Sequence, residues 1–216
     1  MAQTLSVQIV CLANSRKLNH RCIAGIDIEA GGWVRPIRRG PDRALSLHVR
    51  RVNGREPQLL DVLKMSLASD RPDDPCQPEN RYVETGAWLR VGSLRPEQVI
   101  AYCESGGMLF HNYLDYVPWD TLVALPRAKR KSLQLVQCQK AVFYTTTNVR
   151  GKLQARATFP YGGISYDLAV TDAEAERRIK EGERLSTQCL LAVSLAGKIS
   201  DERPQCYKLV AGVIEL

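Results

Sequence analysis

The fold is decided by a stretch of strict alternation, Leu153-Gln-Ala-Arg-Ala-Thr-Phe159. Successive side chains of a β-strand point to opposite faces of the sheet, so the apolar residues at 153, 155, 157 and 159 share one face. Gln154, Arg156 and Thr158 share the other face, which we expect to be exposed to solvent. The pattern therefore predicts a strand with one buried face.

Further strands are expected on both sides of this one. Residues 133–147 are rich in Val, Thr, Phe and Tyr and contain neither Gly nor Pro, which is typical of a strand. Asn148-Val-Arg-Gly151 predicts the turn that follows, and Tyr161-Gly-Gly163 predicts the next one. Residues 164–170 then form a third strand, in which we expect Tyr166 to face the core.

A helix and two more strands complete the second half. We expect Thr171 to cap the helix, Glu174 to complete a capping box and Gly182 to end it. Strands are predicted at residues 189–195 and 206–214. The order β-β-β-α-β-β is that of an OB-fold barrel.

The first half has similar elements with weaker boundaries. The strong hairpin signal Ala30-Gly-Gly32 separates two of its strands. We predict loops at residues 39–57 and 69–79, a short helix after Arg95-Pro-Glu97 and a connecting segment at 105–131. The strands are predicted at residues 5–13, 21–29, 32–38, 58–68 and 80–90. The fold class is thus mainly β, with two OB-like five-stranded barrels in tandem, at residues 1–126 and 127–216.

The charge is distributed unevenly along the chain. The 216 residues carry a formal net charge of +7. Between Asp120 and Asp167 there is no acid, whereas eight Lys and Arg residues fall in this interval, and residues 1–60 hold ten bases against four acids. Basic residues gathered on one surface are the electrostatic signature of a protein that binds polyanions. The alternative is an ordinary solvated face.

Several other classes of protein are disfavoured. The seven cysteines form no CxxC pair, so we expect no metal and interpret them as small apolar core residues. The chain has no signal-peptide pattern and no apolar run long enough for a membrane span, so we expect a cytoplasmic protein. Sequence patterns of nucleophilic, phosphate-binding and metal-dependent enzymes are missing as well. We therefore expect a protein that is not an enzyme and needs no cofactor.

Five segments resemble one known family. They are Cys11-Leu-Ala-Asn-Ser-Arg-Lys17, Arg21-Cys-Ile-Ala-Gly25, Trp33-Val-Arg-Pro36, Gln77-Pro-Glu-Asn80 and Cys206-Tyr-Lys-Leu-Val-Ala211. Because these segments occur in the same order, the chain resembles the dual OB-containing domain proteins of prokaryotes. The resemblance implies two OB-like barrels and a role in nucleic-acid binding. It implies no established reaction and no catalytic residues.

The candidate binding residues of the first half lie in a loop and a strand. The loop between the first two strands flanks the usual OB binding face, so its polar and basic residues are candidates for phosphate contacts, with an ordinary polar turn as the alternative. In the strand, an exposed Trp beside arginines would stack on bases, although Trp is often a core residue of small barrels. These candidates are Asn14, Ser15, Arg16, Lys17 and Arg21 in the loop, and Trp33, Arg35 and Arg38 in the strand.

The candidate binding residues of the second half lie within the acid-free interval between Asp120 and Asp167. Phe143 and Tyr144 are neighbours and point to opposite faces, and we expect Tyr144 to be the exposed one because its hydroxyl tolerates water. The basic run before the barrel and the first hairpin of the barrel supply the cations. The candidates are Lys129, Arg130, Lys131, Lys140, Tyr144, Arg150, Lys152, Arg156 and Tyr161.

One further segment could hold a small ligand. Gln77, Glu79 and Asn80 form a cluster of one acid and two amides before a strand. The alternative is a turn.

The leading hypothesis for the function of the whole protein is a non-catalytic binder of single-stranded or structured DNA or RNA. The alternatives are a protein–protein adaptor, since a fold does not fix a function, and a sensor of a nucleotide or small ligand in the cleft between the barrels.

Overall fold

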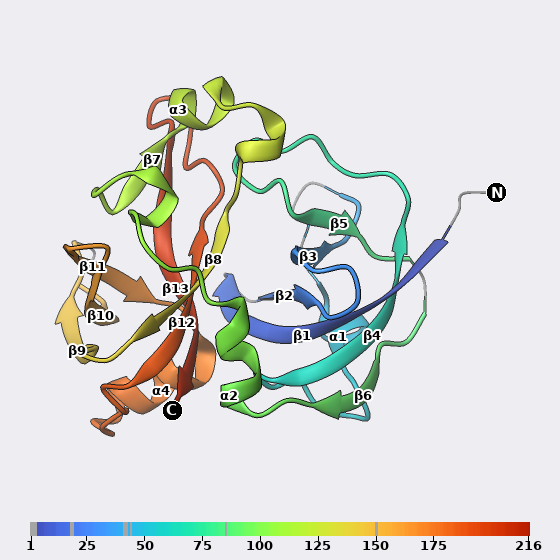
Figure 1. Ribbon diagram of the computed structural model, residues 1–216, viewed down its shortest axis with the longest axis horizontal. Helices are drawn as coiled ribbons and strands as arrows, with labels where there is room; N and C mark the ends of the chain where they lie inside the picture. The colour runs from blue at the N-terminus through green and yellow to red at the C-terminus, as the bar shows by residue number, and fades with distance from the viewer. Residues whose placement is uncertain (1–3, 18–19, 41–42, 44, 85, 150) are drawn as a thin grey trace.

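The protein consists of two β-sheets that lie side by side. The computed structural model describes residues 4–216 apart from 18–19, 41–42, 44, 85 and 150. One sheet comes from the first half of the chain and the other from the second half, shown from blue to green and from yellow to red in Figure 1. The predicted fold class is confirmed.

The second sheet has OB-fold connectivity. Its order is β8-β12-β13-β11-β10-β9, and β11 pairs with β13 in parallel. β8 and β9 are consecutive pieces of one bent strand, so pairing β8 with β12 and β9 with β10 closes the sheet on itself. The elements are β8 (Leu133–Cys138), β9 (Val142–Thr147), β10 (Leu153–Tyr161), β11 (Ile164–Val170), α4 (Ala173–Lys180), β12 (Cys189–Leu195) and β13 (Gln205–Glu215).

Two details of this half differ from the prediction. The strand expected at 133–147 is interrupted at residues 139–141, because it must leave β12 and join β10 to close the barrel. The cap of α4 is Asp172 rather than Thr171. Its Oδ1 accepts hydrogen bonds from the backbone N–H groups of Glu174 (3.0 Å) and Ala175 (3.1 Å), which a helix start leaves unpaired. Gly182 ends the helix with a φ of +81°, as predicted.

The first sheet follows the same plan with shorter elements. Its order is β5-β3-β2-β1-β4-β6, and a bridge from Leu67 to Val83 connects the β5 end to β4. The strand predicted at 80–90 is divided into β5 and β6, and the loop predicted at 39–57 contains α1. The elements are β1 (Thr4–Lys17), β2 (His20–Asp27), β3 (Trp33–Ile37), α1 (Leu47–Arg50), β4 (Asp61–Ala68), β5 (Asn80–Tyr82) and β6 (Leu89–Ser93).

The connecting segment packs against the second sheet. β7 pairs with β13, and Leu109, Phe110, Val117 and Leu122 join the apolar core of the second half. The proposed boundary at residue 126 stays a prediction. The segment contains β7 (Tyr116–Pro118), α3 (Trp119–Ala124) and two 3-10 helices, η2 (Leu109–His111) and η3 (Arg127–Lys129), and it is preceded by α2 (Pro96–Val99) and η1 (Ile100–Tyr102).

A third apolar cluster joins the two halves. Val10 and Leu12 of β1 pack with Leu135 of β8 and Leu190 of β12, all fully buried. The backbones approach closely here, since a Cβ added at Gly212 would lie 2.0 Å from the carbonyl oxygen of Leu12. Burying this apolar surface stabilises the contact between the barrels. No helix among the described residues is long and apolar enough to cross a membrane.

Candidate nucleic-acid interface

The outer face of the second barrel carries an aromatic ring beside a guanidinium. Tyr144 of β9 and Arg156 of β10 are cross-strand partners, so their side chains lie on the same face. Both bind Asp167 of β11. The Tyr144 hydroxyl donates to Oδ2 (2.8 Å) and Arg156 Nε donates to Oδ1 (2.9 Å). We call Tyr144, Arg156 and Asp167 the outer-face cluster.

The charge of Arg156 is neutralised within this cluster. Its Nη2 also donates to the backbone oxygen of Asp167 (2.7 Å), and its side chain is 22% exposed. Burial lowers the pKa of the Arg156 guanidinium, but the hydrogen bond and charge of Asp167 outweigh it, so the pKa is raised. Arg156 points outward as alternation predicts. Arg156 is not the free cation that phosphate binding requires, because Asp167, at the end of the acid-free interval, forms an ion pair with it.

A groove runs beside the cluster. It has a volume of about 540 Å³ and is also lined by Thr146, Gln154 and Val149. Lys140 precedes β9 and Lys152 follows its partner loop, so the two exposed lysines flank the strand at opposite ends. Phe143 packs against the core, as predicted from its neighbour. The candidate Arg150 lies outside the described residues.

Two predicted contacts are buried, which corrects the sequence analysis. Arg35 is only 1% exposed and its Nη2 donates to Ser194 Oγ (3.0 Å) across the barrels, because β3 faces the second half rather than solvent. Tyr161 is also buried. Its hydroxyl lies 3.2 Å from the carbonyl oxygen of Glu104 and 3.1 Å from that of Gly106. Neither side chain can contact a nucleic acid at the surface.

The predicted loop of the first barrel is occupied by internal contacts. Arg16 forms an ion pair with Glu176 of α4 (3.1 Å), and Arg21 forms one with Glu56 (3.3 Å). Asn14 donates to the carbonyl oxygen of Pro57 (2.8 Å). Ser15 Oγ lies 3.5 Å from the carbonyl oxygen of Cys22, and the Lys17 side chain lies outside the described part of the chain. The ion pair of Arg16 joins the two barrels and that of Arg21 lies within the first barrel, so neither side chain is a free phosphate ligand.

The remaining basic candidates have different environments. Arg38 and Lys129 are exposed, whereas Lys131 forms an ion pair with Glu104. Arg130 donates through Nε and Nη2 to the carbonyl oxygens that end α3 (2.9 and 2.7 Å). Trp33 is half-buried against the shared apolar cluster, which favours the core interpretation over an exposed stacking platform.

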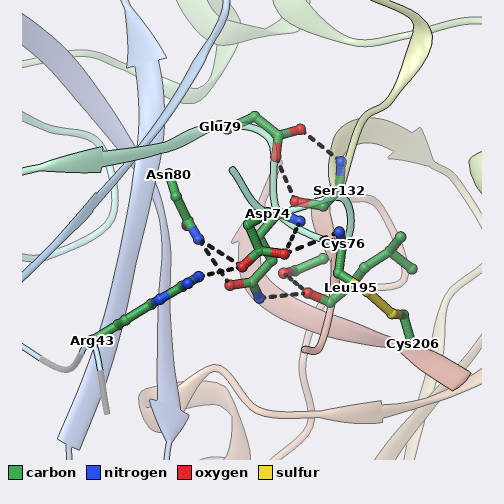
Figure 2. The surroundings of a disulfide bond; sticks show 10 residues. Arg43, Asp74, Cys76, Glu79, Asn80, Ser132, Leu195 and Cys206 are labelled. Carbon is green, nitrogen blue, oxygen red and sulfur yellow. Dashed lines mark hydrogen bonds and ion pairs between the residues drawn. A yellow bond between two sulfur atoms is a disulfide. The ribbon is translucent and has the colours of Figure 1, made fainter. Parts of the chain in front are cut away.

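The proposed ligand loop is a joint between the barrels (Figure 2). Glu79 accepts hydrogen bonds from the backbone N–H (2.6 Å) and the hydroxyl (2.5 Å) of Ser132, and Gln77 donates to the carbonyl oxygen of Leu195 (3.1 Å). Asn80 is fully buried and donates to Asp74 (3.4 Å) and Gln77 (3.3 Å). The bonds of Glu79 and Gln77 to the second barrel favour the turn interpretation, and a ligand-binding role of this loop stays a prediction.

A disulfide lies within this joint. Cys76 and Cys206 are bonded, and both are buried, although 130 positions separate them in the sequence. Figure 2 shows Cys76 beside Asp74, whose Oδ1 accepts a hydrogen bond from the Cys76 backbone N–H (3.0 Å). The sequence analysis expected only apolar packing for these two cysteines, because spacing along the chain gives no hint of such a distant partner.

Sequence reasoning missed three cations that the structure brings together. Arg71 of the loop before β5, Arg81 of β5 and Arg127 of η3 line one cleft between the barrels, with Arg130. Arg71 and Arg81 lie in residues 61–120, which contain ten acids and five bases, and this acidic excess gave no reason to expect a basic site there. Among the described residues there is no cluster of His, Cys, Asp and Glu that could hold a metal ion.

Comparison with known proteins agrees with this architecture. The family model of the dual OB-containing domain matches residues 7–213, so the chain belongs to that family and is a dual OB-fold protein. No curated protein matches the chain. Among solved structures, the chain is similar to a crystal structure of the tetrameric p202 HIN2, with 7% identity and a TM-score of 0.33 over 99% of this chain and 95% of that one. A likeness of that degree carries no argument about function.

Proposed function

We propose that this protein is a non-catalytic module that binds single-stranded or structured nucleic acid on the outer face of its second barrel. The observation that carries this proposal is the groove beside Tyr144, with its ring on an OB outer face and polar groups around it. The strands of an OB barrel and the loops that flank them form its usual binding surface for oligonucleotides. The two lysines at the ends of β9 add positive charge along it.

Each group of the groove has a task in this proposal. The Tyr144 ring stacks on a base, and its hydroxyl bond to Asp167 holds the ring in one orientation before binding. Gln154 and Thr146 offer donors and acceptors to base edges. Lys140 and Lys152 contact phosphates, which fix the strand without reading its sequence.

A protein–protein adaptor is the competing class, and salt dependence separates the two. Fluorescence anisotropy with labelled single-stranded DNA, single-stranded RNA and duplex, at several salt concentrations, tests the proposal. Each phosphate contact with a single strand contributes about −0.7 to the slope of log K against log salt. We expect a steep slope with single strands, and Lys140→Ala with Lys152→Ala reduces it. A flat response, or no binding at low salt, overturns the proposal.

A further inference from the structure

A cleft between the two barrels gathers arginines from both. Arg71 and Arg81 reach it from the first barrel, and Arg127 and Arg130 reach it from the segment that leads into the second. Trp33 and the turn at Gly31 complete its wall. We call this feature, with a volume of about 440 Å³, the arginine cleft. It is distinct from the groove beside Tyr144, which shares no lining residue with it.

These four arginines lack the carboxylate partners that several other arginines of the described chain have. Arg39, Arg50 and Arg90 each form an ion pair with a carboxylate. Within the described residues none of the four cleft arginines forms such a pair, and the contacts recorded for Arg81 and Arg130 are with backbone carbonyl oxygens. An arginine held by neutral carbonyls keeps its whole charge, so the cleft is a concentrated positive site.

Arg81 is the most telling of the four. It is 9% exposed, and its Nη2 donates to the carbonyl oxygen of Ala68 (3.2 Å). Its Nε is buried without a hydrogen-bond partner. A buried donor that is left unpaired costs free energy, most of all on a charged group. A guanidinium that lines a cleft and has only part of its donors satisfied favours the binding of an anion there.

The acids of the cleft do not supply that anion. Glu79 accepts hydrogen bonds from the backbone and hydroxyl of Ser132. Asp27 Oδ1 accepts from the backbone N–H groups of Glu29 (3.0 Å) and Ala30 (3.1 Å), which fixes the turn. Both carboxylates hold the walls in place. The lining residues comprise four arginines and these two acids, so positive charge is left over.

The arginines also repel one another. Burial lowers the pKa of Arg81, and the nearby charge of Arg71 lowers it further, against the opposing charge of Asp27. Like charges in a partly buried site destabilise each other, and a bound anion removes that cost. Guanidinium groups match phosphate oxygens in geometry, because two parallel N–H groups bind two oxygens at once.

We propose that the arginine cleft binds the phosphate monoester of a nucleotide, either free or at the end of a nucleic-acid strand. The volume lies within the range of sites that hold small ligands. Gly31 and Gly32 also line the cleft, and as glycines they add no side chain to its wall. An internal phosphodiester carries one charge, whereas a terminal phosphate carries close to two at neutral pH and matches several arginines better.

Isothermal titration with five probes tests this proposal. The probes are inorganic phosphate, a nucleoside 5′-monophosphate, and one short oligonucleotide with and without a terminal phosphate, placed at the 5′ or the 3′ end. We expect the terminal phosphate to raise affinity about tenfold, because a charge-assisted hydrogen bond contributes roughly this much. Tighter binding of the free monophosphate than of the phosphorylated strand assigns the site to nucleotides, and the reverse assigns it to strand ends.

The variants use exposed residues so that the fold is preserved. In Arg71→Ala with Arg127→Ala the preference for phosphate should disappear, whereas Arg184→Ala, an exposed arginine away from the cleft, should retain it. Melting temperatures confirm that each variant is folded. Tyr144→Ala should retain the phosphate preference while it weakens strand binding, which separates failure of this site from failure of the outer face. Equal affinity with and without the phosphate, or a preference that survives the double substitution, overturns the proposal.

Discussion

The outer face of the second barrel and the arginine cleft are both basic, but they differ in how their charge is balanced. On the outer face Arg156 has a carboxylate partner on the neighbouring strand, β11, and among the described residues of this face the lysines at the ends of β9 keep a free charge. In the cleft, Arg71 and Arg127 form no ion pair with a carboxylate of the described residues, although Asp27 and Glu79 also line it. The outer face therefore presents an aromatic ring and a polar groove with little net charge, whereas the cleft presents several arginine side chains whose positive charge is not neutralised by an ion pair.

The two regions also differ in what builds them. The outer face belongs to a single hairpin and its neighbouring strand, so it depends on local register. The cleft exists only while the two barrels keep their relative position. Contacts that join the barrels should therefore affect the cleft first, and changes within the hairpin should affect only the outer face.

The largest effect should come from the disulfide between Cys76 and Cys206. Cross-linking a separation of 130 residues restricts the unfolded chain, and disulfides that close long loops stabilise proteins by about 2–5 kcal/mol. We expect Cys206→Ala to lower the melting temperature clearly and to weaken phosphate binding in the cleft. Strand binding that depends on Tyr144 should change less. Calorimetry and anisotropy measure the two effects.

The control for this prediction is Cys138→Ala, a buried cysteine of β8 without a disulfide. It removes a small apolar group and should cost less than the loss of the cross-link. If Cys206→Ala impairs the outer face as strongly as the cleft, the barrels behave as one unit and the proposed distinction fails.

A smaller effect is expected from the backbone contact between the barrels. Gly212→Ala places a Cβ 2.0 Å from the carbonyl oxygen of Leu12, so the strands must move apart. Overpacking of this kind typically costs about 1–3 kcal/mol. We expect a lower denaturation midpoint and weaker phosphate binding. The matched control is Gly197→Ala, where an added Cβ meets no atom within 4 Å and stability should be almost unchanged.

Much of the fold could be predicted because it depends on periodicity. Alternation placed Ala155, Ala157 and Phe159 inside and Arg156 outside, and all four lie as expected. Leu153, predicted on the buried face, is 50% exposed, because it begins β10 beside the turn of the hairpin. The interruption of the strand at residues 133–147 could not be predicted, because the bend serves barrel closure and leaves the composition unchanged. In the first half the strands predicted at 21–29, 32–38 and 58–68 correspond to β2, β3 and β4, whereas the strand predicted at 80–90 is divided into β5 and β6.

The candidate site was harder to predict, because charge along a sequence does not show which charges meet in space. Arg16 and Arg21 belong to a basic block, yet each finds an acid that is distant in the sequence. Arg81 belongs to an acidic block and finds none. The same limit applies to Arg35. Alternation assigns its side chain to one face of the strand, but it cannot show that the second barrel covers that face.

A third prediction concerns stacking on the outer face. Tyr144→Ala should weaken binding of single strands by about 1–3 kcal/mol, the range for loss of one aromatic platform. Tyr144→Phe retains the ring and loses only the hydrogen bond to Asp167, so it should retain most of the affinity. Both variants should melt close to the wild type, because Tyr144 is only half-buried and lies outside the apolar core of the barrel. A large drop in melting temperature with unchanged affinity would place Tyr144 in the structural core.

The smallest expected effect addresses the difference in charge balance directly. Asp167→Asn removes the negative charge that neutralises Arg156, while the amide oxygen can still accept a hydrogen bond from the guanidinium. An ion pair this exposed contributes at most about 1 kcal/mol, so the melting temperature should hardly move. Because Arg156 then becomes available to a phosphate, single strands should bind more tightly and the salt slope should steepen by about 0.7. Adding Arg156→Gln to Asp167→Asn should cancel both gains. If Asp167→Asn weakens binding instead, the carboxylate serves the ligand itself, and the contrast between a neutralised outer face and an unneutralised cleft would have to be abandoned.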